Sequence, residues 1–270
     1  MKRILIFYKK SSLKPIGGPS GYLYSLMEGL REINPGIQID LLEDENSYLT
    51  IKKKNNVVKR LIRENLEKFY LEYERHRRVL YILCGKYEKR LDLSNYAAVH
   101  FHTTMDMFIM RDTLKEYHGQ VILTSHSPEP LSMEMIADIH PLFKIVYGGK
   151  YKELIDMDRY AFRRADYIVF PNMYADEPYA MKWREYCALK EYKKSQYKYV
   201  LTGTIPAKVY QSKEAIRKRY GIPQDAFVIS YVGRHNVVKG FDQLKSVGRV
   251  LLKRYRNIWF IVGGWNAPIK

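Results

Sequence analysis

Cysteine is nearly absent from this sequence, which has only Cys84 and Cys187 among its 270 residues. Two cysteines cannot build a disulfide framework, and neither lies in a spacing typical of metal ligands, so a reducing cytoplasm is predicted. Long hydrophobic runs are also missing, since no apolar stretch approaches the length needed to cross a bilayer. The N-terminal MKRILIFYKK has an apolar core (4–8) too short for a signal peptide, and it predicts a first strand instead.

Acidic residues are scarce beside basic ones: 29 Asp and Glu stand against 46 Lys and Arg, giving a formal net charge of +17. Such a surface attracts nucleic acid, anionic lipid or phosphorylated substrates, and charge alone does not choose among them. The sequence shows no recognition helix, RNA-binding aromatic motif or zinc knuckle. Nucleic acid is therefore not an expected partner, and a basic nucleic-acid-binding protein is kept only as an alternative.

Short apolar runs alternate with helical stretches along the whole chain. Most of the runs are continuous hydrophobics rather than alternating ones, as expected for strands covered on both faces. Strand and helix in alternation predict an α/β protein with parallel sheets. Strands are expected at 3–8, 37–42, 97–102, 120–126, 166–171, 197–203, 227–233 and 258–264, and helices at 18–33, 153–165, 211–222 and 241–255. Ser212 is the expected N-cap of the third helix. The other three helices are expected to bury apolar stripes, which are Tyr22, Leu26, Leu30 and Ile33; Leu154, Met157 or Asp158, and Ala161; and Phe241, Leu244, Val247, Leu251 and Leu252.

A break in this pattern falls at 203–212, GTIPAKVYQS. Six predicted strands precede the break, and a fresh β-loop-α-β pattern follows it. We predict a complete N-terminal Rossmann-like domain over 1–205 and the start of a second one over 206–270. Two strands and one long helix are fewer than a doubly wound domain normally needs, so the second domain is expected to be truncated.

The first candidate site is the loop KPIGGPSGYLYSL (14–26), between the first predicted strand and its helix. Gly17 and Gly18 allow backbone conformations and close approaches that a Cβ would forbid. The helix N-terminus that follows favours a phosphate or sugar hydroxyls. The pattern is not G-x-G-x-x-G, so a nicotinamide cofactor is not favoured. A flexible β-α turn is the alternative.

Histidines follow two neighbouring strands. The motif TSHSPEP delivers His126 at a strand end, where open α/β sheets gather their ligands, and Glu129 in the same loop could act as an acceptor or base. VHFHTT places His100 and His102 on one face of the preceding strand. No third ligand stands at a diagnostic spacing, so no metal is expected, and a structural or acceptor-side role is favoured. Loop histidines satisfying carbonyl groups are the alternative.

The stretch YVGRHNVVKGFDQL (231–244) places two cations after a predicted strand. Gly233 directly precedes Arg234, and Gly240 directly follows Lys239 before a predicted helix. A guanidinium binds phosphate oxygens in fork geometry and an ammonium binds them as a point charge. We therefore expect a diphosphate at this loop, although a lone Arg and Lys in a loop are usually just solvated.

Segment 52–90 carries 13 Lys and Arg against 5 Glu. Its apolar residues, Val58 through Tyr73, fall at helical spacing with an aromatic edge. A basic amphipathic helix is compatible with an anionic membrane surface, and an ordinary helix packed on the sheet is the equal alternative. The basic-aromatic run 190–200 adds to the membrane case, so the protein is expected in the cytoplasm, as a peripheral protein on the inner face of the cell membrane.

Together these motifs resemble those of the GT-B glycosyltransferases of family 4, the retaining enzymes that act on nucleotide sugars. The resemblance covers essentially the whole chain. It lies in the glycine-rich GGPSGY, the strand-end histidine of TSHSPE, the segment ELIDMDRYAFRRADYIVFPN, and above all YVGRHNVVKGFDQL followed by FIVGG.

The resemblance implies a role for each matching residue. Arg234 and Lys239, beside Gly233, would bind the donor diphosphate and stabilise the leaving nucleotide, in place of a divalent metal. Gly17 and Gly18 would approach the donor phosphate or sugar. His126 would contact the transferred sugar near the reacting centre. Acceptor-side candidates are His102, Glu129 and Asn172.

The family also carries two glutamates eight residues apart after the Arg and Lys, and no such pair follows Lys239 here. The chain is therefore expected to be the N-terminal part of a longer hexosyltransferase and to be inactive by itself. The membrane features favour a lipid-linked or growing envelope or capsular glycan as acceptor, by analogy. A non-catalytic GT-B-like partner protein is the other alternative.

Overall fold

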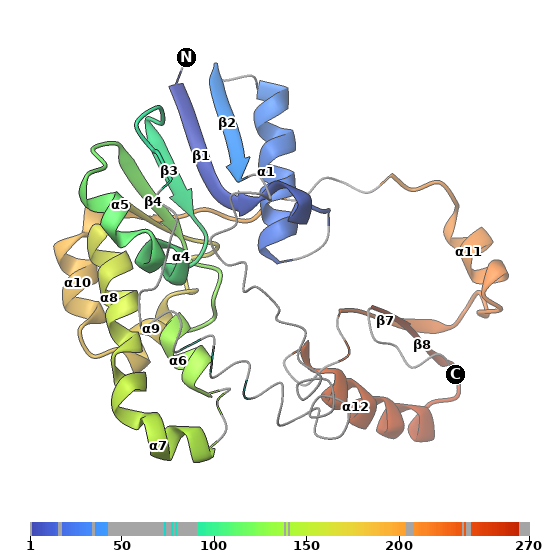
Figure 1. Cartoon of the computed structure of the whole chain (residues 1–270). Coiled ribbons are helices and arrows are strands. Elements are labelled where there is room, and N and C mark those ends of the chain that lie inside the picture. The colour runs from blue at the N-terminus through green and yellow to red at the C-terminus, as the bar shows by residue number, and fades with distance from the viewer. Residues whose placement is uncertain are drawn as a thin grey trace, which may run out of the picture. The chain divides into compact units, whose positions relative to one another are not determined.

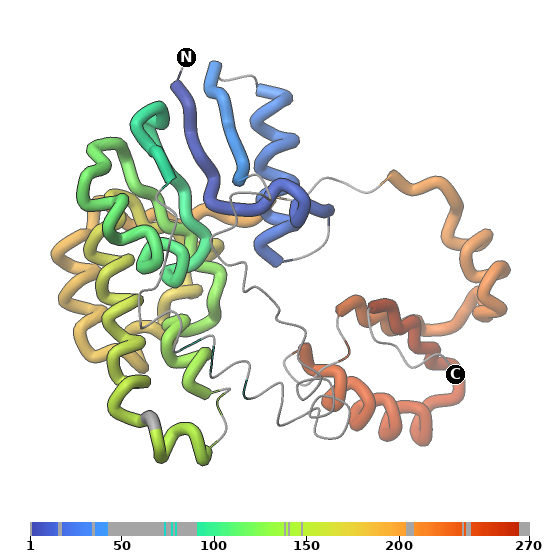
Figure 2. Tube along the Cα trace, viewed as in Figure 1, coloured from blue at the N-terminus to red at the C-terminus, as the bar shows by residue number. Residues whose placement is uncertain are grey.

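The structure is a computed structural model of the chain. It divides into two compact units, Met1–Ile205 and Pro206–Lys270, which are traced in Figure 2. The residues that it describes are 2–15, 18–33, 36–42, 73, 77, 79, 91–137, 139, 141–203, 208–233, 235 and 239–264.

The first unit contains a six-stranded sheet in the order β2-β1-β3-β4-β5-β6. All neighbouring strands pair in parallel, as the continuous apolar runs predict. The prediction of six strands in this unit is confirmed, with shorter ends in some. The strands are β1 Lys2–Lys9, β2 Ile37–Leu42, β3 Ala98–Phe101, β4 Gln120–Thr124, β5 Tyr167–Phe170 and β6 Tyr197–Tyr199.

Helices join these strands, and Figure 1 shows α1 at one side of the sheet with α4, α5 and α8 together at the other. The predicted helices α1 and α8 are confirmed, while α6, α7 and the helices between β3 and β4 and between β5 and β6 were not predicted. The helices of the described part of this unit are α1 Pro19–Ile33, α4 Thr104–Ile109, α5 Arg111–Lys115, α6 Leu131–Ala137, α7 Pro141–Lys152, α8 Leu154–Arg164, α9 Glu177–Lys182 and α10 Tyr186–Tyr192, with 3-10 turns at Lys10–Ser12 and Lys194–Gln196.

The core of the first unit lies against the central strands. Val99, Val121 and Ile168, from three adjacent strands, have no exposed surface. Helix α8 buries one complete stripe as predicted, comprising Leu154, Met157, Asp158, Ala161 and Phe162. The stripe predicted for α1 was wrong in part.

In α1 the buried positions are Ser20 and Leu23, and Ile33 is 71% exposed. The predicted stripe from Tyr22 to Ile33 assumed that the whole helix packs on the sheet. Its last three residues, 31–33, are instead exposed, whereas Tyr22, Leu26 and Leu30 are half-buried, so the stripe ends before Ile33.

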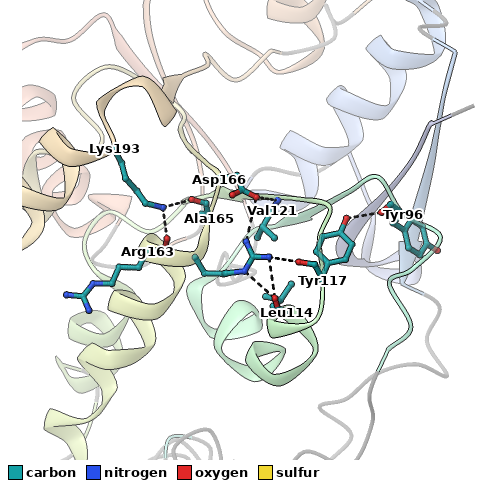
Figure 3. Close-up of polar contacts among 9 residues, drawn as sticks. Tyr96, Leu114, Tyr117, Val121, Arg163, Ala165, Asp166 and Lys193 are labelled. Carbon is teal, nitrogen blue, oxygen red and sulfur yellow. Dashed lines mark hydrogen bonds and ion pairs between the residues drawn. The ribbon is translucent and has the colours of Figure 1, made fainter.

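Side-chain to backbone bonds fix the start of the central strands (Figure 3). The Asp166 carboxylate accepts from the Val121 N–H at 2.8 Å, which ties the chain before β5 to β4. The Arg164 guanidinium donates to the carbonyls of Leu114 and Tyr117. Lys193 Nζ donates to the carbonyls of Arg163 and Ala165, the free acceptors at the end of α8. These bonds lie at the end of the sheet opposite the predicted site.

The second unit is a β-α-β arrangement. Strands β7 (Phe227–Val232) and β8 (Ile258–Gly263) pair in parallel, α12 (Phe241–Arg254) connects them, and α11 (Lys213–Arg219) precedes β7. Ser212 caps α11 as predicted, accepting from the Ala215 N–H. The prediction of these elements is confirmed.

Burial in the second unit differs from the prediction. We expected β7 to be a buried strand, but its described side chains are exposed or half-buried, with Phe227 67% exposed. On α12, Phe241, Leu244 and Leu251 are half-buried, whereas Val247 is 54% exposed. The reason is that the described part of this unit offers a two-stranded sheet and one long helix, which cover only part of each other.

Most of segment 52–90, predicted to be a basic amphipathic helix, lies outside the described residues. Within it, Tyr73, Arg77 and Val79 are helical. Tyr73 is exposed, while Val79 packs in a small core cluster beside Ile139 and Leu154. In the described part of the chain, no helix combines the length and the apolar character required to cross a membrane.

Candidate functional site

The predicted site residues of the first unit follow the carboxyl ends of β1, β3, β4 and β5. From β1 the chain crosses to β2 at one side, whereas β3, β4, β5 and β6 follow one another toward the other side. The direction therefore reverses between β1 and β3. In open α/β sheets, such a switch point at the carboxyl ends of the strands is where ligands bind.

Two histidines meet at this edge. His102 follows β3 and His126 follows β4, and the distance between His102 Nδ1 and His126 Nε2 is 3.0 Å. One of the two nitrogens therefore carries the proton and donates to the other. The rings stack with centroids 5.2 Å apart. We refer to His102 and His126 as the histidine pair.

A third histidine supports this pair. His100 Nε2 lies 2.7 Å from Thr124 Oγ1 on the neighbouring strand, and its ring centroid lies 4.3 Å from that of His102. Tyr22, from α1, packs its ring edge on His126 at 5.0 Å. The sequence indicated each histidine separately, but Tyr22 and Thr124 were missed. The pairing of β3 with β4 brings Thr124 to His100, and the packing of α1 brings Tyr22 to His126.

Burial keeps all three rings neutral. It lowers the pKa of His100 to about 4, and the neighbouring His126 adds to the effect. It lowers the pKa of His126 to about 4, and it lowers the pKa of His102 well below the ordinary value. Burial likewise raises the pKa of the Tyr22 hydroxyl. At neutral pH the edge therefore offers neutral donors and acceptors for hydroxyl groups rather than a positive charge.

One atom of the pair is buried without a partner. His102 is 3% exposed, and its Nε2 has no hydrogen-bond partner among the residues that the structure describes. Leaving such an atom unpaired costs about 1–3 kcal/mol. Buried polar atoms are almost always hydrogen-bonded, so an unpaired one at a switch point indicates a functional site.

The glycine-rich loop joins α1 as predicted, although Gly17 lies outside the described residues. Gly18 has φ +77°, a left-handed conformation that side chains with a Cβ rarely adopt, and its carbonyl accepts from the Tyr22 N–H. Ser20 was not predicted as a site residue. Its buried hydroxyl accepts from the Lys14 N–H at 2.8 Å and lies 2.8 Å from the Ser12 carbonyl, which fixes the loop on the helix.

The other acceptor-side candidates make local contacts. Glu129 forms an ion pair with Lys182 of α9. Asn172 is exposed after β5, and its Oδ1 accepts from the Tyr174 N–H at 2.9 Å. The structure gives no contact between either residue and the histidine pair, so both remain candidates by position alone.

In the second unit the predicted diphosphate loop follows β7. Arg234 lies outside the described residues, whereas Lys239 is exposed next to Gly240, the N-cap of α12. The Gly233 N–H donates to the Gly263 carbonyl at 3.0 Å. A Cβ on Gly264 would lie 1.8 Å from the Gly233 carbonyl oxygen, so the backbones following β7 and β8 approach each other more closely than any other residue allows at 264.

His235 in this loop was not predicted as a site residue. Its ring stacks on Phe241 with centroids 4.1 Å apart, and both ring nitrogens are buried with no hydrogen-bond partner in the described part of the chain. The sequence signal was available, because His235 follows Arg234 directly.

Among the residues that the structure describes, no group of three His, Cys, Asp or Glu side chains is arranged to hold a metal ion. The three histidines illustrate why, since His102 Nδ1 and His126 Nε2 bond each other and His100 Nε2 bonds Thr124.

No protein-family model and no curated protein sequence matches this chain. Similar solved structures include sucrose-phosphate synthase from Thermosynechococcus elongatus, with a TM-score of 0.53 and 16% identity over 100% of this chain and 64% of that chain. Two weaker likenesses are S. aureus MnaA with UDP (TM-score 0.45, 12% identity, 99% of this chain and 64% of that one) and LpCGTa with UDP (TM-score 0.36, 12% identity, 98% and 71%).

The chain thus spans just under two thirds of the sucrose-phosphate synthase structure. At 16% identity this likeness shows the fold alone. With the six-stranded parallel sheet and the second β-α-β unit, it shows an α/β fold of the GT-B type, built from Rossmann-like units.

Proposed function

We propose that this protein is a glycosyltransferase that moves a sugar from a nucleotide-sugar donor to an acceptor. The observation that carries the proposal is the neutral histidine pair at the switch point of the six-stranded sheet, 3.0 Å apart between His102 Nδ1 and His126 Nε2. Neutral imidazoles bond sugar hydroxyls without attracting competing anions. The fold likeness to sucrose-phosphate synthase supports the same class by analogy.

Within this proposal the two histidines have different tasks. His126 is only half-buried and would contact the transferred sugar, whereas His102 is 3% exposed and would orient the His126 ring from behind. This changes the task expected for His102, which was an acceptor-side contact. The reason is geometric, because a side chain so deeply buried has little surface to offer an acceptor.

Cations of the second unit would bind the donor diphosphate. Arg234 and Lys239 would neutralise charge on the leaving nucleotide, which removes the need for a divalent metal. Gly17 and Gly18, at the start of α1, would approach the donor phosphate or sugar. Retention of the anomeric configuration is part of this proposal.

We further propose a glycan or lipid-linked acceptor of envelope or capsule synthesis, met at an anionic membrane surface through segment 52–90. Its support is the excess of basic residues in that segment. Glu129 and Asn172 are the acceptor-side residues in this scheme. Glu129 would have to leave its ion pair with Lys182 to contact an acceptor.

The donor proposal is tested by titrating UDP, GDP and ADP, each alone and as the glucose conjugate, while recording amide shifts of β7 and α12. We expect the diphosphate to shift residues around Gly233 and Gly240. Lys239→Ala should weaken this binding about 10- to 100-fold, since a charge-assisted contact contributes about 1.5–3 kcal/mol. Lys253→Ala, in the last turn of α12, is the matched control and should bind as the wild type does.

Two results would overturn the diphosphate assignment. One is wild-type affinity in both Arg234→Ala and Lys239→Ala. The other is the absence of any shift with every nucleotide at millimolar concentration.

A further inference from the structure

A buried carboxylate lies beneath the two loops that carry the histidine pair. Asp158 of α8 has no exposed surface. Thr104 Oγ1 donates to Asp158 Oδ1 at 2.5 Å. Ser132 donates twice to Asp158 Oδ2, from its hydroxyl at 2.5 Å and from its backbone N–H at 3.0 Å. Hydroxyl bonds this short are typical of an ionised carboxylate acceptor.

The partners of Asp158 stand at informative places in the chain. Thr104 is the first residue of α4, two residues after His102. Ser132 is the second residue of α6, six residues after His126. Helices α4 and α6 both pack on α8, and Figure 1 shows the three together in the first unit. One carboxylate therefore joins the two chain segments that leave the two histidines.

The His126 loop is held from a second direction. Tyr179 of α9 is 1% exposed, and its hydroxyl lies 2.6 Å from Ser125 Oγ and 3.3 Å from the Ser127 carbonyl. These contacts flank His126 on both sides in the sequence. The loop is thus fixed by α9 next to the histidine and by Asp158 where α6 begins.

We infer that Asp158 is a positioning residue that keeps His102 and His126 at hydrogen-bond distance by tying the starts of α4 and α6 to α8. The inference rests on the proposed function only for the ligand of the histidine pair, which would be a donor sugar. Among the described residues Asp158 has no basic partner, and a carboxylate buried in this way costs stability compared with a packed apolar side chain. Burial accordingly raises the pKa of Asp158, while the bonds from Ser132 and Thr104 oppose that rise. We explain this buried carboxylate by its effect on the positions of His102 and His126.

The test uses ¹⁵N chemical shifts of the histidine rings, which report the tautomer and hydrogen bond of each nitrogen. Asp158→Asn keeps the shape of the side chain but replaces one of the two accepting carboxylate oxygens, Oδ1 or Oδ2, with an amide nitrogen that donates. Thr104→Val removes the hydroxyl at nearly constant volume, and Thr104→Ser restores it. Asp156→Asn, an exposed change on the same helix, is the matched control.

We expect one fixed tautomer for the histidine pair in the wild type, in Asp156→Asn and in Thr104→Ser. Asp158→Asn and Thr104→Val should give averaged ¹⁵N shifts for His102 and His126, with His118 unchanged as an exposed internal reference. In the same samples, both variants should lose at least about tenfold in affinity for whichever nucleotide sugar the wild type binds, because misplaced groups bind poorly.

Wild-type ¹⁵N shifts in both Asp158→Asn and Thr104→Val would overturn the inference. If Asp158→Asn fails to fold, the Thr104→Val and Thr104→Ser pair still decides. If the shifts change as expected but no nucleotide sugar binds the wild type, the positioning role stands and the proposed function fails. The ¹⁵N shifts therefore test the positioning role of Asp158, and the binding of a nucleotide sugar tests the proposed function.

Discussion

His102 and His126 are 24 residues apart in the sequence, and their contact depends on the pairing of β3 with β4. His100 pairs with Ile122 in this register, so the histidines beyond the strand ends become neighbours. The result is a set of three rings that burial holds in the neutral state. Chemistry at this edge is therefore hydrogen bonding to neutral groups.

The same burial predicts a pH dependence of stability. His100 has a folded-state pKa of about 4, below its ordinary 6.5, so the unfolded chain binds more protons between these values. The free energy of unfolding should therefore fall as pH drops from about 6.5 to about 4. His100→Gln, which can still bond Thr124, should remove up to about 3 kcal/mol of that loss in urea unfolding curves.

His118→Gln is the control for this measurement, since His118 is exposed. It should reproduce the wild-type slope of stability against pH. A His100→Gln variant with the same slope as the wild type would show that His100 does not contribute to acid sensitivity.

At the scale of elements, the strands were the most predictable part of the chain. Their apolar runs are short, continuous and rich in branched residues, and all eight appear as strands. Helix α8 was predictable for a similar reason, because its buried stripe recurs with helical spacing. The second unit was also predicted as β-α-β from its sequence.

The short helices and the contacts of the site were not predictable in this way. Helices α4, α5, α9 and α10 are five to seven residues long, which is too short for a periodic stripe. The Asp158 contacts join residues 26 and 54 positions apart, so no local pattern indicates them. The ion pair between Glu129 and Lys182 could not be predicted for the same reason, because it joins residues far apart in the sequence.

Burial predicts a difference in local stability between the elements. Residues of β3 and β4 such as Val99 and Val121 have no exposed surface, whereas Val232 of β7 is 88% exposed. Amide hydrogen exchange should therefore be slowest in β3 and β4 and clearly faster in β7 and β8. Equal protection in the two sheets would contradict this description of the second unit.

For the whole molecule, the net charge of +17 is the property that the described structure explains least. Much of the excess lies in 52–90, so its contact with an anionic membrane stays a prediction. Nucleic acid stays an alternative that the sequence does not favour, because the chain shows no recognition helix, RNA-binding aromatic motif or zinc knuckle.

The central claim is that a nucleotide sugar contacts this pair, and it is tested most directly by histidine-edited NMR of the whole chain. Ring signals of His102 and His126 are followed while UDP-glucose, GDP-glucose or ADP-glucose is added, with the matching free diphosphates as controls. We predict that at least one nucleotide sugar shifts both signals, while the free diphosphates leave both signals unmoved and the exposed His118 shifts in neither case. Histidine signals that no nucleotide sugar moves, or that the diphosphates move equally, would contradict the account.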